Sequence, residues 1–158
     1  MASLLAVDVG VRSGLALFGE DGQLRWQRSQ NFGSVTRLRQ AIPALLRSIP
    51  DLVQIVLEGG GACADPWVQE ATRRDIAVRM ISAETWRQAL LYEREQRSGE
   101  IAKQHALELA YGVLRRSTTK IRIPHTLRHD AAEAILCGLW GTIELGWNDT
   151  SILRHKTV

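Results

Sequence analysis

The chain has 158 residues, of which 45% are hydrophobic and 23% charged, so it is long enough for one globular domain and too short for two ordinary ones. It contains no apolar run of membrane length, and its two cysteines, Cys63 and Cys137, match no zinc spacing. The net charge is only +3, but residues 86–128 hold nine Arg or Lys against four Glu, which indicates a side that faces a polyanion.

Five segments have the apolar or alternating pattern of β-strands: residues 4–8, 14–19, 24–32, 53–57 and 75–81. The first two are expected to form a hairpin, and a turn at residues 20–22 leads into the third strand. Three antiparallel strands are therefore predicted to open the fold, and two further strands follow between helices.

Helical spacing of apolar residues predicts helices over residues 34–49 and 100–116. Residues typical of helix starts and ends predict helices over residues 65–74 and 127–145 and a short helix that begins at Ser82. Pro43 predicts a kink or a late start in the first helix, and Thr126 is expected to cap the last one, which Gly146 ends. Residues 92–99 are predicted to be a loop and residues 117–124 a basic connection. The domain is expected to span residues 1–146, with a tail over residues 147–158.

The order of these elements predicts an α/β fold with a five-stranded mixed sheet flanked by helices. The glycine-rich phosphate loops of dinucleotide-binding proteins and of P-loop nucleotide hydrolases do not occur in the chain. Their absence argues against both of those classes.

Four acidic residues occupy positions that could bring them together. Asp8 and Glu58 each end an apolar strand, and Asp130 and Glu133 lie three residues apart, on one face of the last helix. Any one of them could be an ordinary surface acid, so the signal is their combination. Four carboxylates at one sheet edge repel each other unless cations neutralise them, and hard oxygen ligands suit Mg²⁺ or Mn²⁺. Two such ions about 4 Å apart can promote hydrolysis of a phosphodiester.

Three stretches carry a family resemblance: Asp8-Val-Gly10, Leu57-Glu58-Gly59 and His129-Asp130-Ala-Ala-Glu133. In this order they resemble the RuvC-type Holliday junction resolvases of the ribonuclease H-like superfamily, over most of the chain. The resemblance implies a ribonuclease H-like fold, paired symmetric nicks in four-way DNA junctions, a homodimer, and two Mg²⁺ or Mn²⁺ ions held by the four acids. Glu133 departs from the family, whose bacterial members usually have Asp at the matching position.

Residues 82–87, followed by Lys103, resemble the part of the family that approaches DNA, with Ala83 in place of a proline and Arg87 in place of a lysine. The tryptophan at position 86 is more like the plant organellar branch than the bacterial enzymes. We expect the protein to be located in the cytoplasm, or in an organelle matrix if a transit peptide has been removed. The predicted DNA contacts are Trp86, Arg87, Lys103, Lys120 and Arg122, with His129 as an accessory residue. A solvated helix surface would explain any one of the cations equally well, and a core or interface role fits Trp86 better than stacking on a base. The helix that carries Trp67 and Val68 is a candidate dimer interface.

Three other functions are compatible with parts of this pattern. A ribonuclease H-like nuclease acting on ribosomal RNA precursors would share Asp8 and the fold, but it matches the last helix less well. One half of an actin-like sugar kinase also opens with a strand and Asp-x-Gly, but it would need a second domain. A non-catalytic junction-binding protein would have no need of all four acids.

Overall fold

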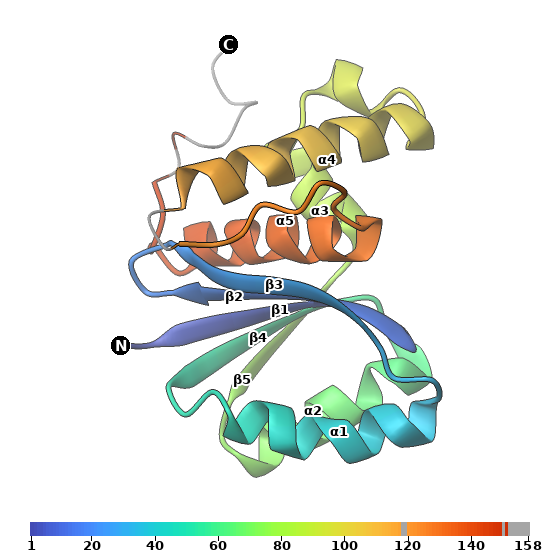
Figure 1. The fold of residues 1–158 in the computed structure, drawn as a ribbon, viewed down its shortest axis with the longest axis vertical. Helices are drawn as coiled ribbons and strands as arrows, with labels where there is room; N and C mark the ends of the chain where they lie inside the picture. The colour runs from blue at the N-terminus through green and yellow to red at the C-terminus, as the bar shows by residue number, and fades with distance from the viewer. Residues whose placement is uncertain (118–119, 150, 152–158) are drawn as a thin grey trace.

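A five-stranded sheet forms the middle layer of the structure, a computed structural model that describes residues 1–117, 120–149 and 151 (Figure 1). The strand order is β3-β2-β1-β4-β5. The first three strands are antiparallel, and β4 and β5 continue the sheet in parallel with β1, as predicted. The bounds of the strands in chain order are β1 Ser3–Asp8, β2 Arg12–Gly19, β3 Leu24–Asn31, β4 Leu52–Glu58 and β5 Ala77–Ile81.

Strand β1 lies at the centre of the sheet, where both of its faces are covered. Its residues from Leu4 to Val7 are all 0% exposed. Because side chains alternate along a strand, Leu4 and Ala6 join the core on one side, and Leu5 and Val7 join the core on the other. This double burial explains why the first strand is an unbroken apolar run rather than an alternating one.

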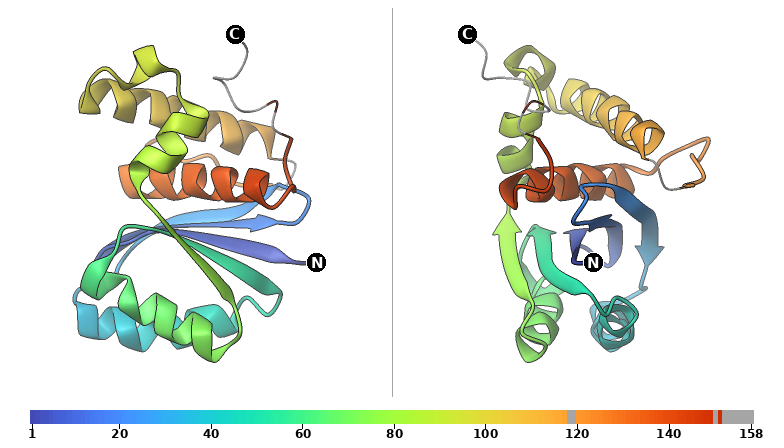
Figure 2. Two further views of the ribbon diagram at one scale, coloured as in Figure 1. Left: turned by 180° about the vertical axis from the view of Figure 1, so that it is seen from behind. Right: turned by 90° about the vertical axis from the view of Figure 1, so that its left-hand side faces the viewer.

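Two layers of helices cover the sheet, one on each face (Figure 2). Helices α1 (Val35–Arg47) and α2 (Asp65–Arg73) lie on one face, and α5 (His129–Glu144) lies on the other, together with α3 (Ala83–Leu90). Helix α4 (Gly99–Arg116) packs on α5, so α5 is buried between the sheet and α4. None of the described helices has the length and apolar character needed to cross a membrane.

Small residues let α5 approach the sheet closely. A Cβ atom on Gly14 of β2 would overlap the backbone carbonyl of Asp130, and one on Gly138 would overlap the ring of Phe18. Glycine is required at both positions by the close approach of backbone to backbone or to a ring. The first turn of α5 therefore lies directly against the end of the sheet where β1 finishes.

The structure corrects several details of the sequence analysis. Helix α5 begins at His129 and its N-cap is Arg128, without a side-chain hydrogen bond, so the prediction that Thr126 caps it is wrong. Helix α1 contains Pro43 but begins at Val35, so the predicted late start is wrong. The expected loop at residues 92–99 contains a 3₁₀ turn, Glu93–Gln96.

One residue marked out in the sequence lies differently from expectation, and two of the expected segments are described only in part. Trp67 of α2 is 0% exposed and packs in the core beneath the sheet, so the prediction that it forms a dimer interface is wrong. Residues 118–119 of the basic connection lie outside the described residues, as do residue 150 and residues 152–158 of the expected tail. Asn148 hydrogen-bonds to the carbonyl of Gly22 and to the hydroxyl of Thr142, which ties the chain after residue 146 to the β2–β3 turn.

Candidate metal centre

The first two acids are placed by the pairing of β1 with β4. Asp8 and Glu58 are partners in the parallel ladder between these strands, so their side chains leave the same end of the sheet. The chain then turns away at Gly59, whose φ of 110° is a conformation that favours glycine. The run of glycines after Glu58 therefore has a local role in ending the strand.

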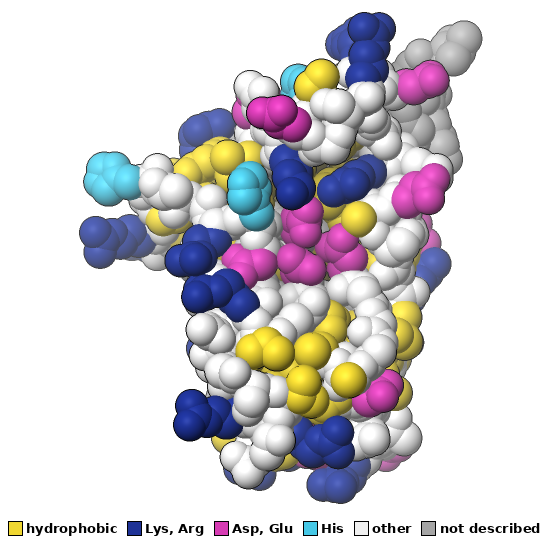
Figure 3. All heavy atoms as spheres, turned by 90° about the vertical axis from the view of Figure 1, so that its right-hand side faces the viewer, with side chains coloured by type: hydrophobic (Ala, Val, Ile, Leu, Met, Phe, Trp, Pro, Cys, Tyr) yellow, Lys and Arg dark blue, Asp and Glu magenta, His cyan; other side chains and the backbone are white. Residues whose placement is uncertain are grey.

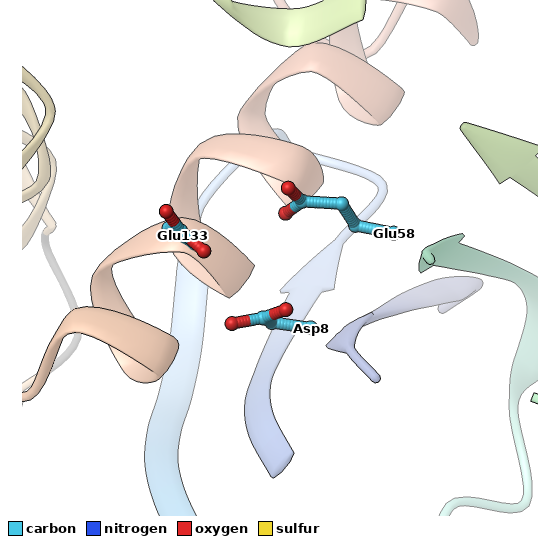
Figure 4. Close-up of side chains that lie close together, drawn as sticks. All are labelled: Asp8, Glu58 and Glu133. Carbon is cyan, nitrogen blue, oxygen red and sulfur yellow. The ribbon is translucent and has the colours of Figure 1, made fainter. Parts of the chain in front are cut away.

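The third acid comes from α5. Glu133 lies in the second turn of this helix, which the small residues described above bring close to the ends of β1 and β2. One carboxylate oxygen from each of Asp8, Glu58 and Glu133 lies within 4.8 Å of the other two, and the three side chains point toward one another (Figure 4). Residues separated by 125 positions in sequence thus form one cluster of carboxylates, which we call the acidic cluster.

Burial and like charges strongly disfavour the ionised form of Asp8. Burial is the largest cause, followed by the negative charges of Glu133 and Glu58, a hydrogen bond with Glu133 and the charge of Asp130, and together they raise the pKa of Asp8 to about 8. Burial likewise raises the pKa of Glu58, against the opposing effects of Cys137, Trp86 and Arg87. A divalent cation would neutralise these charges, and hard carboxylate oxygens are the ligands that Mg²⁺ and Mn²⁺ prefer, so the residues present fit such an ion.

Asp130 lies outside the acidic cluster, although its charge acts on Asp8. Its Oδ2 atom accepts a hydrogen bond of 2.8 Å from the hydroxyl of Ser29 on β3, and its Oδ1 atom accepts one of 2.7 Å from the backbone N–H of Ala131. Its role as a metal ligand therefore stays a prediction. The structure brings together three of the four predicted acids and directs the fourth to a neighbouring serine.

Two residues of the site were not predicted from the sequence. Ser29 contacts Asp130, and Cys137 donates a hydrogen bond of 3.1 Å from its Sγ atom to Oε2 of Glu58. Cys137 follows Glu133 by one helical turn, so the spacing of four residues on α5 was the signal that could have identified it. For Ser29 no local signal existed, because its position depends on the pairing of β2 with β3, which sets it opposite Gly14.

Arg87 of α3 lies beside the acidic cluster. Its Nη2 atom is 3.6 Å from Oε1 of Glu133, and the two side chains are 25% and 20% exposed. The guanidinium also lies over the ring of Trp86, 5.3 Å from its centroid. A cation that was predicted to approach DNA thus contacts one of the carboxylates directly.

Trp86 itself is 0% exposed and belongs to the core between the sheet and α5. A buried indole cannot stack on an unpaired base, so Trp86 has the core role that the sequence also allowed and is not placed to contact DNA. Its ring packs beneath Arg87, and its N–H is close enough to Glu58 to favour the ionised carboxylate. Trp86 therefore supports the site from inside the core.

The remaining predicted DNA contacts are exposed. Lys103 is in the first turns of α4, Lys120 and Arg122 lie in the connection between α4 and α5, and His129 is the first residue of α5. Figure 3 shows that acidic side chains gather near the middle of one face, with Lys and Arg side chains beside and above them. These residues stay predicted DNA contacts, and His129 a predicted accessory residue.

Comparisons with known proteins give a match by structure and none by sequence. No protein-family model and no curated protein sequence matches the chain. The solved structure of RuvC from Thermus thermophilus is similar, with a TM-score of 0.58 and 14% sequence identity, over 89% of this chain and 96% of that one. This likeness shows that the chain has the ribonuclease H-like α/β fold that its sequence predicts.

Proposed function

We propose that the protein is a metal-dependent endonuclease that resolves four-way DNA junctions. The observation that carries this proposal is the acidic cluster, in which one carboxylate oxygen from each of Asp8, Glu58 and Glu133 lies within 4.8 Å of the other two at the end of the sheet. Mutually repelling carboxylates of this kind occur where hard cations bind. The RuvC-like fold adds support, because RuvC gives its name to the resolvases that the sequence motifs resemble.

Two Mg²⁺ or Mn²⁺ ions, when bound, would supply an activated water and stabilise the 3′-oxygen leaving group of the cleaved phosphodiester. Asp8, Glu58 and Glu133 would hold these ions, and Asp130 would complete the ligand set from the first turn of α5. Arg87 would bind a phosphate oxygen beside Glu133, where it now forms an ion pair. Each of these roles uses a side chain at the same end of the sheet.

The DNA substrate is proposed from the charge around the acidic cluster. Lys103, Lys120 and Arg122 are exposed cations in the predicted polyanion-facing region, and phosphate contacts of this kind position a nucleic acid without reading its sequence. Paired nicks in two DNA strands of like polarity require two active sites, so we propose a homodimer. We also propose that residues 1–146 contain the whole nuclease domain.

One experiment tests the substrate. The protein is incubated with a synthetic four-way junction, a linear duplex of the same sequence and an RNA–DNA hybrid, in Mg²⁺ or Mn²⁺. We expect paired, symmetric nicks in the junction and little cleavage of the duplex. Cleavage of the hybrid or of RNA without cleavage of the junction would favour an RNA-directed nuclease, and binding of the junction without cleavage by any metal would favour a non-catalytic junction-binding protein.

A further inference from the structure

We infer that Cys137 is a positioning residue, which holds the carboxylate of Glu58 toward Asp8 and Glu133 by donating a hydrogen bond to it. The inference deepens the proposed function, on which it rests for its relation to metal binding. Its starting point is the contact between Cys137 Sγ and Glu58 Oε2, 3.1 Å long and buried, which joins α5 to β4 across 79 residues of sequence.

Glu58 needs such a partner because it is nearly enclosed. The residue is only 7% exposed, and a buried carboxylate is costly unless donors or cations face it. Trp86 is close to Glu58, but among the described side chains its indole N–H is one of the buried donors without a hydrogen bond of good geometry. Among the side chains that the structure describes, Cys137 is therefore the one that donates a hydrogen bond of good geometry to Glu58.

The surroundings of Cys137 suit a structural role. The residue is 0% exposed and belongs to the core between the sheet and α5. A cysteine buried in a core is usually inert rather than reactive. Its contact with Glu58 therefore points to a structural use of the thiol as a hydrogen-bond donor.

The position of Cys137 on α5 explains how this hydrogen bond acts on the acidic cluster. Cys137 follows Glu133 by four residues, so one helix supplies both a carboxylate of the cluster and the donor that restrains a second carboxylate. With one oxygen of Glu58 held by the thiol, rotation of the carboxylate is limited while it faces Asp8 and Glu133. Partners of this kind commonly change metal affinity by about 10–100-fold when they are removed.

The first test measures Mn²⁺ binding by calorimetry in three variants of the full chain. Cys137→Ala removes the donor, Cys137→Ser retains a hydroxyl donor, and Cys63→Ser changes the other cysteine, which lies outside the acidic cluster. We expect Cys137→Ala to weaken Mn²⁺ binding about tenfold. Cys137→Ser should restore much of this loss, and Cys63→Ser should match the parent. Equal affinity of Cys137→Ala and the parent, or equally weak binding by the Ala and Ser variants, would overturn the inference.

The second test needs no metal and examines the hydrogen bond itself. In the Cys63→Ser background, Cys137 is the only thiol in the chain, so the infrared S–H stretching band reports on it alone. We expect this band at the lower frequency of a hydrogen-bonded thiol, and a shift to higher frequency in a further Glu58→Leu variant whose circular dichroism matches the parent. A band that is the same with and without the Glu58 carboxylate would overturn the inference.

The two tests also separate this inference from the proposed function. If the parent protein bound no Mn²⁺ and cleaved no junction, the proposed function would fail. The infrared band would then still show whether Cys137 donates a hydrogen bond to Glu58. If the parent bound Mn²⁺ and cleaved junctions while Cys137→Ala behaved identically, the positioning role alone would fail.

Discussion

The hydroxyl of Ser29 donates a hydrogen bond of 2.8 Å to Oδ2 of Asp130, and so connects β3 to the first turn of α5 across 101 residues of sequence. This hydrogen bond uses one carboxylate oxygen of Asp130, an acid that the sequence motifs assign to metal binding. It also links the strand that lies at the edge of the sheet to the helix that covers it.

We predict that Ser29→Ala lowers the free energy of unfolding by about 1 kcal/mol, because a partly buried carboxylate loses a hydrogen-bond donor. Chemical denaturation of the metal-free protein measures this change. Ser48→Ala is a matched comparison, because the Ser48 hydroxyl donates to the carbonyl of Leu45 at an exposed helix end and its loss should cost much less. Equal effects of the two substitutions would contradict the role given to Ser29.

The pKa of Asp8 predicts how the stability of the metal-free protein depends on pH. This pKa is about 8 in the folded protein and 3.8 for the ordinary side chain, so the folded state binds the proton more tightly than the unfolded state. The free energy of unfolding should therefore fall as the pH rises from about 4 to about 8. Thermal melts in EDTA across this range measure the fall.

Asp8→Asn should remove most of this dependence on pH and should raise the melting temperature of the metal-free protein near pH 8, because the amide carries no charge. Glu93→Gln alters an exposed acid outside the acidic cluster and should leave the dependence unchanged. If the melting temperature of the parent stayed level between pH 5 and 8, the carboxylates of the acidic cluster would not repel one another as described.

For catalysis, we predict that Asp8→Asn reduces junction cleavage by at least about 100-fold, because the variant loses a carboxylate that would hold the metal. Junction binding in EDTA, measured by gel shift, should be retained, since the substitution removes a negative charge from the surface that faces DNA. Normal cleavage by Asp8→Asn would rule out the metal assignment.

The exposed cations between α4 and α5 should determine how junction binding depends on salt. The double variant Lys120→Gln/Arg122→Gln should bind more weakly, and the slope of log K against log salt should become shallower by about two, one for each lost phosphate contact. Arg73→Gln provides the comparison. Its side chain is 76% exposed on α2, on the other face of the sheet, and it should leave the slope unchanged.

Much of the fold and part of the site could be predicted from the sequence, because both follow from local patterns. Apolar runs and glycine turns predicted all five strands, and the carboxylates of Asp8 and Glu58 were recognised as strand ends. The spacing of Asp130 and Glu133 predicted that both lie on one face of the last helix. These are properties of short segments, which the chain carries wherever the segments pack.

Only the tertiary structure decided which of these groups meet. Asp130 and Glu133 are three residues apart on α5, yet Ser29 donates a hydrogen bond to Asp130 while Glu133 joins Asp8 and Glu58. Strand pairing and the close approach of α5 at Gly14 determine the neighbours of each acid. The choice between a core role and a DNA contact for Trp86 was likewise decided by packing. The sequence by itself determined the acids and the elements that carry them, whereas their partners depend on packing between segments that lie far apart in the chain.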